Sequence, residues 1–402
     1  MNSKYEVKKL GDYIVQVRGI SYKPTDISEE PIDTHMAVLR ANSIKNNKLI
    51  LEDLIYVNKD LVKENQIIKE NDILIAASSG SKEIVGKSVQ IKDNTNFTFG
   101  AFCKIVRCSE KIEPRYVGYF LRTPYYRSTI SNLVCGANIN NLKNEHIDEL
   151  LIPMPSREIQ QKIVNILDKS QELIDKRKEQ IEALDELVKS QFIEIFGEPF
   201  SNTKMWEKQP LNKLVTDDCT ISYGIVQTGE EQKQGIPVFR PVDIVNNRKP
   251  KLEELKKTTE EISNKYKKTI LQGNELLITV RANIGDVCVI DEEFKGCNVG
   301  RGIVPIRVKE EINPIFLKYQ FESYRIQHEL KALSKGITLI QLNMEDLRQF
   351  MLIVPPIELQ NQFVNFVKQV DKLKFKMEKS LKKLEDNFNS LMQKAFKGEL
   401  FN

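Results

Sequence analysis

The sequence predicts an α+β protein in which two tandem-repeat globular domains are separated by two long helices that pair as an antiparallel coiled coil. Two observations lead to this prediction. The helical segment REIQQKIVNILDKSQELIDKRKEQIEALDELVKSQF occupies residues 157–192, and IELQNQFVNFVKQVDKLKFKMEKSLKKLEDNFNSLM follows at 357–392, 200 positions later. The stretch before each helix mixes short β-branched runs with helical patterns, so the repeating unit is a globular domain followed by a helix.

In both long segments the apolar positions alternate steps of four and three, which is the spacing of a coiled-coil seam. The first seam runs through Ile163, Leu167, Ser170, Ile174, Arg177, Ile181, Leu184, Val188, Gln191 and Ile195, of which seven are apolar. The second runs through Phe363, Val367, Val370, Lys374, Met377, Leu381, Leu384, Phe388, Leu391 and Ala395, of which nine are apolar when alanine is counted. A single narrow seam on a rod of roughly 58 Å needs a partner helix.

Prolines and glycines set the expected ends of the two helices. Pro155 precedes the first helix and Pro355 the second, where proline suits the last extended residues before a helix. The glycines in FGEPF (196–200) and FKGELF (396–401) suit helix termination, because glycine accepts a positive φ.

We expect each long helix to be the partner of the other. Two unrelated helices that cover only their own domains would not need the same register, preceding prolines and terminal glycine. The intervening domain permits either direction, but a two-fold relation between the halves requires antiparallel helices. Phe192, Phe196 and Phe396 lie outside the strict seam, and either helix-end packing or contact with a partner protein explains them.

The repeat also extends through the globular domains. The matching segments are SKYEVKKL (3–10) with KMWEKQPL (204–211), ISY (20–22) with ISY (221–223), VLRANSIKNN (38–47) with VFRPVDIVNN (238–247), ENDILIA (70–76) with GNELLIT (273–279), and GANINNLKNEHIDELLIPMP (136–155) with GITLIQLNMEDLRQFMLIVP (336–355). We therefore place the first domain at 1–155, the first spacer helix at 156–197, the second domain at 198–355, and the second spacer helix with a C-terminal tail at 356–402.

Each domain is expected to mix strands and helices. The runs DILIAAS, FCKIVRC, ELLITVR, VCVID and GIVPIRV read as strands. The segments 114–133 and 314–333 read as helices with proline in the first turn.

Composition limits the classes of protein to consider. The 402 residues are 41% hydrophobic and 29% charged, with no signal-peptide pattern and no run of 18 apolar residues, so we expect a cytoplasmic protein. A net charge of only +4 argues against a general polyanion-binding protein. The cysteines at 103, 108, 135, 219, 288 and 297 form no C-x-x-C pair and are expected to be buried, reduced thiols.

Two polar loops contain the side chains that suit nucleic-acid contact. SSGSKEIVGKS (78–88) and VRANIGDV (280–287) combine glycine with Ser, Asn, Lys and Arg. Glycine lets the backbone approach a ligand, and amide and guanidinium groups can read base edges or phosphates. An ordinary polar turn is the alternative for each loop. For Arg40 and Arg240, which occupy matching positions after a strand, the alternative is a structural ion pair.

Over nearly its whole length the chain resembles the specificity (S) subunits of type I restriction-modification systems. The most specific element is proline followed by Glu158 and Gln160, seen again at Glu358 and Gln360. The resemblance also rests on the two-fold repeat, on LLIPMPSREIQQKIVNIL (150–167) and MLIVPPIELQNQFVNFV (351–367), and on GNELLITVRANIGDVCVIDEEFKGCNVGRGIVPIR (273–307). The first domain departs from the pattern, with Tyr5 opposite Trp206 and with a different loop at 78–88.

This resemblance implies that each globular domain is a target recognition domain that reads one half of a bipartite, asymmetric DNA site. The implied partners are double-stranded DNA, two methylation (M) subunits and restriction/translocase (R) subunits. S-adenosylmethionine is expected on the methylation subunit, and no cofactor on this chain. The residues expected on or near DNA-facing loops are Arg40, Ser79, Ser81, Lys82 and Lys87 in the first domain, and Arg240, Arg281, Asn283, Asn298 and Arg301 in the second.

An enzyme is the less favoured reading. A methyltransferase would need a glycine-rich cofactor loop and an Asn/Asp-Pro-Pro-aromatic motif, but the only Pro-Pro pair, at 355–356, is followed by Ile357. His35, His146 and His328 show no metal-ligand spacing, and no carboxylate set suggests a nuclease. We therefore predict no catalytic residue and no metal site. The remaining alternative is a non-catalytic coiled-coil scaffold that binds only protein partners.

Overall fold

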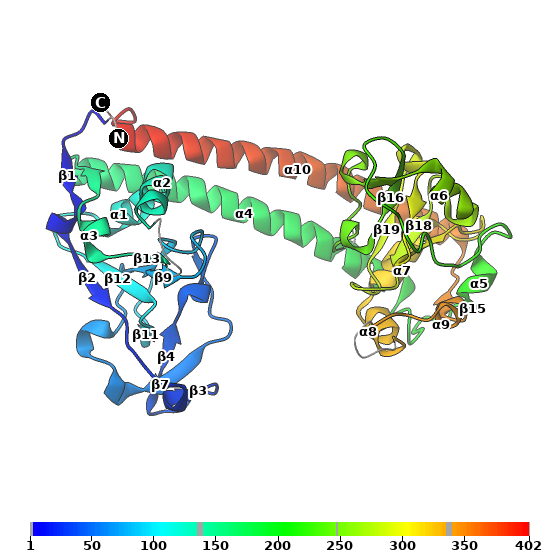
Figure 1. Ribbon diagram of the computed structural model, residues 1–402, viewed down its shortest axis with the longest axis horizontal. Helices are drawn as coiled ribbons and strands as arrows, with labels where there is room; N and C mark the ends of the chain where they lie inside the picture. The colour runs from blue at the N-terminus through cyan, green and yellow to red at the C-terminus, as the bar shows by residue number, and fades with distance from the viewer. Residues whose placement is uncertain (1–2, 135–139, 247, 335–339, 402) are drawn as a thin grey trace. The chain divides into compact units, whose positions relative to one another are not determined.

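The computed structural model describes residues 3–134, 140–246, 248–334 and 340–401 (Figure 1). The chain folds as two compact units. Unit 1 comprises Met1–Lys178 and Lys379–Asn402, and unit 2 comprises Glu179–Glu378. Each unit therefore contains one globular domain and a part of both long helices. Cys135, Asn247 and the matched positions 136–139 and 336–339 lie outside the described residues.

The two long helices are α4, Arg157–Phe196, and α10, Ile357–Lys397, close to the ranges expected for them. Each ends at a glycine in the left-handed region, with φ of 73° at Gly197 and 72° at Gly398. A side chain at either position would strain the backbone, which explains why the sequence places glycine there.

Within unit 1 the first half of α4 packs on the last half of α10, so the two helices run antiparallel (Figure 1). The apolar residues of this contact are Ile163, Leu167 and Ile174 from α4 and Phe388, Met392 and Ala395 from α10. Lys178 Nζ lies 2.9 Å from Glu385 Oε1 beside the seam.

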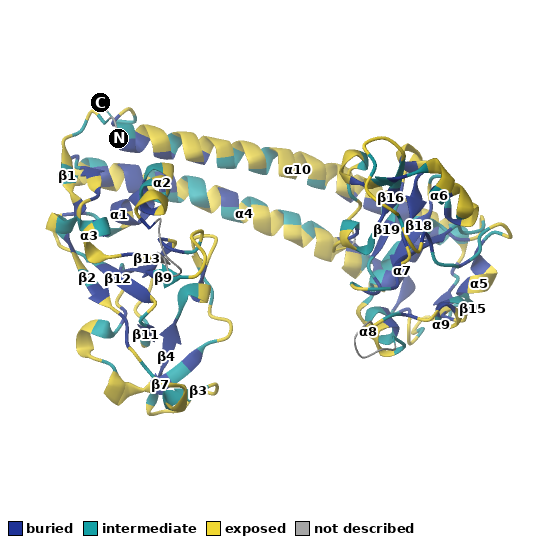
Figure 2. Cartoon of the chain, in the orientation of Figure 1, coloured by how far each residue is buried: buried dark blue, intermediate teal, exposed yellow. Residues whose placement is uncertain are grey.

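Unit 2 shows the same arrangement between the last half of α4 and the first half of α10. Its seam contains Leu184 and Val188 from α4 and Phe363, Val367 and Val370 from α10. Lys374 Nζ lies 2.7 Å from Asp185 Oδ2. In both helices the buried positions lie toward the ends, and the central stretches 175–187 and 371–387 are half-buried or exposed (Figure 2). The predicted antiparallel pairing is thus confirmed inside each unit.

The phenylalanines outside the strict seam pack at the helix ends. Phe192, Phe196 and Phe396 are at most 2% exposed. The Phe196 ring centroid lies 4.7 Å from that of Phe316, and the Phe396 centroid lies 4.9 Å from that of Tyr116. Of the two explanations left open by the sequence, helix-end packing is the one that the structure supports.

Unit 1 contains two four-stranded sheets. The antiparallel sheet has the order β10-β8-β12-β2, with β2 Ile14–Arg18, β8 Ile73–Ala76, β10 Ser88–Gln90 and β12 Cys103–Cys108. The second has the order β11-β4-β7-β3, with β3 Ile27–Ser28, β4 His35–Leu39, β7 Ile55–Asn58 and β11 Phe97–Phe99, and its β4 and β11 are parallel. Strand β8 is apolar throughout because both of its faces are buried. Ile73 and Ile75 belong to one hydrophobic cluster of the unit, and Leu74 and Ala76 belong to another.

Short elements complete unit 1. They are β1 Val7–Lys9 paired with β14 Leu151–Pro153, β5 Ile44–Lys45 with β6 Lys48–Leu49, β9 Ser78–Ser79 with β13 Asn140–Asn141, and helices α1 Pro114–Phe120, α2 Pro124–Leu133 and α3 Asn144–Asp148. The helix expected over 114–133 is therefore two helices. Proline at 124 lacks an N–H and keeps Thr123 extended, and Thr123 caps α2 by accepting from the Tyr126 N–H at 3.2 Å.

Unit 2 repeats this plan with two three-stranded sheets. Their orders are β19-β18-β21 and β17-β16-β20, with β16 Ile236–Phe239, β17 Lys256–Thr258, β18 Leu276–Thr279, β19 Val287–Val289, β20 Asn298–Val299 and β21 Ile303–Ile306. The other elements are β15 Lys208–Pro210 paired with β22 Met351–Ile353, and helices α5 Leu211–Leu214, α6 Glu260–Lys265, α7 Pro314–Glu322, α8 Tyr324–Ala332 and α9 Met344–Arg348. The segment 314–333 is again two helices, separated at Ser323.

Equivalent contacts confirm much of the predicted repeat. Tyr5 donates from its hydroxyl to the Phe401 carbonyl at 3.1 Å in unit 1, and Trp206 donates from Nε1 to the Phe196 carbonyl at 2.9 Å in unit 2. Both rings therefore lie at the C-terminal end of a long helix. The two acceptors are not equivalent, because Phe196 is the last residue of α4 whereas Phe401 follows the end of α10. The tyrosine and the tryptophan therefore occupy matching places but make different hydrogen bonds.

A buried ion pair also recurs between equivalent strands. Arg107 Nη2 lies 2.7 Å from Asp72 Oδ2 in unit 1, and Arg307 Nε lies 3.3 Å from Glu275 Oε1 in unit 2. The acidic side chains are 2% and 0% exposed. This agrees with the match of ENDILIA to GNELLIT, which aligns the two acids.

The match of ISY at 20–22 with ISY at 221–223 is wrong. Residue 20 forms a parallel bridge to Gly100, and the residue that forms this bridge to Gly300 in unit 2 is Ile225. The equivalent dipeptides are therefore Gly-Ile at 19–20 and at 224–225. A Cβ on the first glycine would lie 2.2 Å from the Gly100 carbonyl oxygen, and one on the second would lie 1.9 Å from that of Val299. Only glycine allows so close a passage.

A buried glutamine joins the start of each long helix to its domain. Gln160 is 1% exposed; its amide donates to the Pro155 carbonyl at 2.9 Å and accepts from the Glu113 N–H at 2.9 Å. Gln360 is 0% exposed and makes the same two contacts in unit 2, with Pro355 and Asn313, both at 2.8 Å. The repeated glutamine of the sequence pattern is therefore a structural residue.

We predict that Gln160→Ala destabilises unit 1 by about 1–3 kcal/mol, because it leaves a buried N–H and a buried carbonyl without their partner. The matched control is Gln161→Ala, which removes an exposed amide that donates to Asn165. Urea denaturation of both variants measures the difference. Equal losses of stability would show that the buried amide does not join helix to domain.

Candidate nucleic-acid interface

In each unit, three segments meet at the ends of strands, and we call them the turn cluster. It comprises 40–42, 78–82 and 100–103 in unit 1, and 240–242, 281–283 and 300–303 in unit 2. In unit 1 the Gly100 N–H donates to the Leu39 carbonyl at 2.9 Å, and the N–H groups of Ala77 and Ser78 donate to the Phe102 carbonyl at 2.8 and 3.0 Å. The segments are thus held together through backbone groups.

The turn cluster of unit 2 is held by equivalent bonds. The Gly300 N–H donates to the Phe239 carbonyl at 2.8 Å, and the Val280 N–H donates to the Gly302 carbonyl at 2.8 Å. One difference lies in loop length. The loop between the bonded residues Ala76 and Gly86 in unit 1 corresponds to the shorter one between Thr279 and Gly285 in unit 2. The same backbone frame therefore presents different loops.

A hollow of about 420 Å³ opens in the turn cluster of unit 1. Its lining includes Tyr22, Arg40, Asn42, Ser79 and Phe102. Arg40 donates from Nη2 to the Asp53 main-chain carbonyl at 2.6 Å, which fixes its guanidinium at the rim. The thiol of Cys103 also lines the hollow, and burial raises its pKa to about 12, so the lining thiol is neutral. Aromatic, guanidinium and amide groups thus share one concave surface.

The structure brings two of the residues predicted in the first domain together and places the other three nearby in the chain. Arg40 and Ser79 line the hollow. Ser81 and Lys82 are exposed in the loop that continues from it, and the Ser81 N–H donates to Ser79 Oγ at 3.2 Å. Lys87 is exposed immediately before β10. All five lie at or close to one surface region of unit 1.

In the second domain, Arg240 forms a structural ion pair, which was the alternative to a role in DNA contact. Its Nη2 lies 2.7 Å from Asp243 Oδ1, and its Nε donates to Asp243 Oδ2 at 3.0 Å. The hydrogen bond to this carboxylate raises the pKa of Arg240. Arg40 has no equivalent acid at 43, where the residue is serine.

Arg281 and Asn283 lie in the turn cluster of unit 2, where both are partly occupied by contacts within the domain. The Arg281 guanidinium lies 5.7 Å from the Tyr223 ring centroid and donates to the Gln341 amide oxygen. Asn283 donates to Asp286 Oδ2 at 2.6 Å and also to the Ile244 carbonyl. Both side chains therefore stabilise the loops of the turn cluster in which they were expected to contact DNA.

Asn298 differs from the other predicted residues because it is 0% exposed. Its Oδ1 accepts from Thr269 Oγ1 at 2.7 Å, and its Nδ2 donates to Ser263 Oγ at 3.0 Å. The side chain is thus an internal tie between β20 and the α6 region, and the expectation that it faces DNA is wrong. Arg301, three residues later, is exposed in the turn that follows β20.

Sequence reasoning missed the contrast between the two turns at 100–103 and 300–303. The first carries Ala101 and Phe102, and the second carries Arg301 and Gly302. Phe102 is 70% exposed at the edge of the hollow. The signal was present, since the glycine that begins each turn recurs 200 positions apart.

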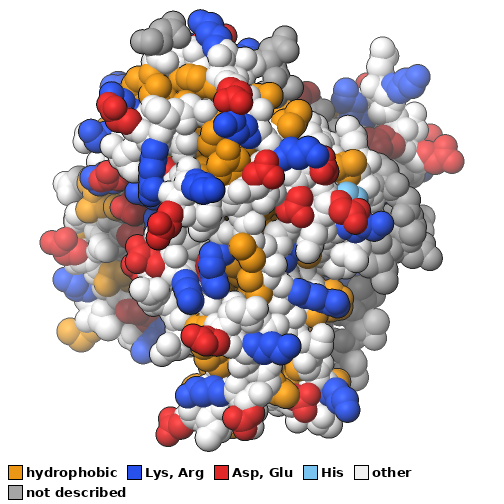
Figure 3. Space-filling model, turned by 90° about the vertical axis from the view of Figure 1, so that its left-hand side faces the viewer, with side chains coloured by type: hydrophobic (Ala, Val, Ile, Leu, Met, Phe, Trp, Pro, Cys, Tyr) orange, Lys and Arg blue, Asp and Glu red, His pale blue; other side chains and the backbone are white. Residues whose placement is uncertain are grey.

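Charges do not gather into one basic patch on the face shown in Figure 3, where Lys and Arg intersperse with Asp and Glu. One lysine of unit 1 is internal. Lys104 is 6% exposed and donates to Gln16 Oε1 at 3.0 Å and to Asn144 Oδ1 at 2.7 Å. Burial lowers its pKa to about 8. On this face, a polyanion therefore meets no broad positive field.

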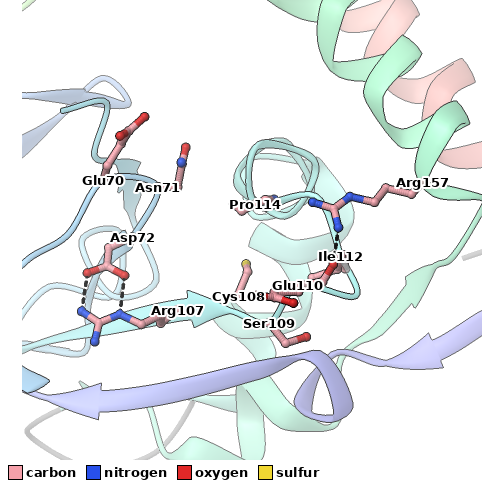
Figure 4. A pocket seen from close by; sticks show the side chains of 10 residues that line it. All are labelled: Glu70, Asn71, Asp72, Arg107, Cys108, Ser109, Glu110, Ile112, Pro114 and Arg157. Carbon is pink, nitrogen blue, oxygen red and sulfur yellow. Dashed lines mark hydrogen bonds and ion pairs between the residues drawn. The ribbon is translucent and has the colours of Figure 1, made fainter. Parts of the chain in front are cut away.

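A second hollow of unit 1, of about 270 Å³, lies between β12 and the start of α4 (Figure 4). Asp72 and Arg107 pair on one side of it, and Arg157 on the other side donates to the Glu110 carbonyl. Asp72, Arg107 and Arg157 thus have partners within the unit, which assigns these three side chains to the scaffold.

The described part of the chain contains neither a cluster of metal-ligand side chains nor a helix of membrane-spanning character. Over those residues, no three or more His, Cys, Asp or Glu side chains are grouped to hold a metal ion. No helix within the described ranges is long and apolar enough to cross a membrane. The described cysteines are free; Cys103, Cys288 and Cys297 are buried, and Cys108 and Cys219 are half-buried.

Comparison with known proteins gives a consistent family assignment. A family model described as the type I restriction modification DNA specificity domain matches residues 2–183 and 222–386. The type I restriction enzyme StySPI specificity subunit of Salmonella potsdam is 29% identical, over 96% of this chain and 86% of its own length. The EcoKI specificity subunit of Escherichia coli strain K12 is 27% identical, over the same shares of the two chains.

Solved structures show the same fold. The S subunit of a type I restriction-modification system from M. genitalium has a TM-score of 0.52 and 14% identity, covering 98% of this chain and 96% of its own. A chain from a study of complex assembly and conformational transition of the type I R-M system has a TM-score of 0.60 and 17% identity, covering 98% of both chains. The predicted architecture of repeated domains and long helices is confirmed.

Asn298 is a buried structural residue and Arg301 is exposed, so their substitutions should differ in their effect on the free energy of unfolding. We predict that Asn298→Ala destabilises unit 2 by about 1–3 kcal/mol, because buried Thr269 and Ser263 lose their partner. Arg301→Ala, in the exposed turn, should change stability by less than about 0.5 kcal/mol. Chemical denaturation of the two variants decides, and a fully stable Asn298→Ala variant would contradict a structural role.

Proposed function

Because the chain belongs to the family of the type I restriction modification DNA specificity domain, we propose that each of its units reads one half of a bipartite, asymmetric DNA site. The chain is the sequence-specific DNA-binding specificity subunit of a type I restriction-modification complex. The turn cluster supports the proposal that the two half-sites have different sequences. Its backbone hydrogen bonds recur in both units, while its exposed side chains differ.

The two turn clusters supply the chemistry that DNA readout needs. Base edges are read by hydrogen bonds and apolar contacts, whereas phosphate contacts fix the position of the protein on the duplex. In unit 2, exposed Arg301 suits a guanine edge, and in unit 1 the exposed cation Lys87 suits a phosphate. Unit 1 presents Arg40 and Ser79 at its hollow, next to an aromatic ring. Different side chains on a common frame select different half-sites.

Repeated exposed apolar side chains support two copies of one protein partner. Leu173 on α4 and Leu373 on α10 are 55% and 44% exposed, 200 positions apart. Leu151 and Met351 form a second such pair at 44% and 46%. Because the same surface feature recurs in each unit, it suits two copies of the same partner, whereas the half-site sequences differ. We assign this role to two methylation subunits, with restriction/translocase subunits joining the complex.

Methyl transfer and DNA cleavage belong to those partners in this proposal. S-adenosylmethionine binds to the methylation subunit, and this chain contributes recognition without catalysis. The chain lacks the aromatic residue that a methyltransferase motif requires after its single Pro-Pro pair. The paired helices hold the two readers apart and so set the length of the unread spacer between the half-sites.

The function is tested by sequencing modified bases in host DNA with and without this gene. The expected result is one bipartite methylated motif, with two different half-sites, that disappears on deletion. The purified chain alone should not methylate DNA, while the chain with its methylation subunits should. A coiled-coil scaffold that binds only protein, which is the competing function, predicts instead an assembled complex with no preference among DNA sequences.

The role of the helices is tested by lengthening both of them. Seven residues inserted after Leu184, with seven after Leu384, add about 10.5 Å and keep the apolar seam in phase. At about 3.4 Å per base pair, the preferred spacer should grow by roughly three base pairs, with both half-sites unchanged.

Selection from a library of spacer lengths gives the measurement for this variant. The added base pairs rotate one half-site by roughly 100°, so weaker binding is expected as well, and the selected spacer is the informative value. A folded and assembled variant that still selects the original spacer would exclude the helices as the determinant of spacing.

A further inference from the structure

The turn at 100–103 presents an aromatic side chain at the surface of unit 1. The Cys103 N–H donates to the Gly100 carbonyl at 2.8 Å, which closes the turn with Phe102 at its third position. The ring is 70% exposed, although a phenylalanine gains much of its stabilising value only when it is buried. A single exposed phenylalanine is not unusual in itself. Its surroundings make this one informative.

Phe102 borders the hollow of the turn cluster. On the other sides of that hollow lie Tyr22, Arg40, Asn42 and Ser79. A guanidinium and an amide can form hydrogen bonds with a base edge, while an aromatic ring contacts a methyl group or the face of a base. The positive charge of Arg40 also suits a polyanion. The occupant that matches all these groups is a nucleobase of the DNA.

Unit 2 has no such aromatic residue at the equivalent place. Its turn at 300–303 is closed by the same bond, from the Ile303 N–H to the Gly300 carbonyl at 3.0 Å. The residue that corresponds to Phe102 is Gly302, where a Cβ would lie 2.4 Å from Pro241 Cγ. The position before it carries Arg301 instead of alanine. The two turns therefore share a backbone and offer opposite chemistry, apolar in unit 1 and cationic in unit 2.

We propose that Phe102 is a specificity-determining residue of unit 1, which makes an apolar contact with a base in the half-site that unit 1 reads. The proposal rests on the function proposed above. Arg40 and Asn42 hydrogen-bond the edge of the same base or of its neighbour in the hollow. The contact uses either the 5-methyl group of a thymine in a stacked pair or the face of an unstacked base, and both are apolar base surfaces.

The experiment uses the complete chain assembled with its methylation subunits and a DNA library randomised in both half-sites. For Phe102→Ala we expect preference at one or two positions of a single half-site to relax by about tenfold, with the other half-site unchanged. Phe102→Leu should retain most of the preference because it keeps an apolar group. The matched control is Leu61→Ala, which trims an apolar residue of unit 1, 43% exposed, outside the turn cluster.

Two modified DNAs identify the base surface in contact. Replacing thymine by deoxyuridine removes the 5-methyl group, and its effect on binding should vanish in Phe102→Ala if that methyl is the contact. If the ring instead contacts an unstacked base, 2-aminopurine at the selected position should brighten with the wild-type chain and not with Phe102→Ala. Either result supports the proposal.

An exchange of the turn residues gives an independent test. Ala101→Arg together with Phe102→Gly puts the unit 2 dipeptide on the unit 1 turn. This variant should change the preferred base in that half-site, in the direction of guanine, rather than only weaken binding.

Three results would overturn the proposal: preferences unchanged in Phe102→Ala, equal weakening over all positions of both half-sites, or the same change in Leu61→Ala. Thermal denaturation of each variant separates these from misfolding, and Phe102→Leu and the exchange variant give the answer if Phe102→Ala is unstable. Failure of the proposed function itself would be distinguished by the wild-type complex, which would then select no bipartite motif at all.

Discussion

The buried glutamine at the start of each long helix is the constraint on which the arrangement of each unit depends. Gln160 and Gln360 each link the prolyl segment before the long helix to the residue that precedes an earlier helix of the domain, α1 in unit 1 and α7 in unit 2. Because the amide is almost fully buried, rotating or shifting the helix would leave polar backbone groups without partners. The helix therefore leaves its domain in a fixed direction, which is what a spacer between two DNA readers requires.

The repeat divides the residues of each unit into a conserved frame and a variable surface. The frame includes the buried pairs Asp72–Arg107 and Glu275–Arg307 and the glycines that pass close to a strand-end carbonyl. All of these are interior contacts for which few residue types fit. The turns, in contrast, are closed by backbone hydrogen bonds that do not depend on side-chain identity. Two half-sites can therefore differ while the fold of the two units stays the same.

Periodicity and spacing were sufficient to predict the long helices, their antiparallel pairing and the equivalence of most strands, since these depend on side-chain patterns that are written in the sequence. The sequence was insufficient where position depends on tertiary contacts. The identical ISY tripeptides are not structurally equivalent. The equivalent residues are Gly19 and Gly224, each of which passes so close to a main-chain carbonyl that no side chain fits. Asn298 resembles a surface residue in type, but its burial is decided by Thr269 and Ser263, 29 and 35 positions earlier.

The loops of a turn cluster are not independent of one another. Gly302 lies against Pro241, so a side chain at 302 requires a change in the loop at 240–242. In unit 1 the matching loop has alanine at 41 in place of that proline, and a phenylalanine is accommodated at 102. A side chain at position 302 therefore requires a second substitution in a segment about 60 residues earlier in the chain. This coupling gives a steric reason why the residues at 41 and 102 in unit 1 both differ from those at 241 and 302 in unit 2.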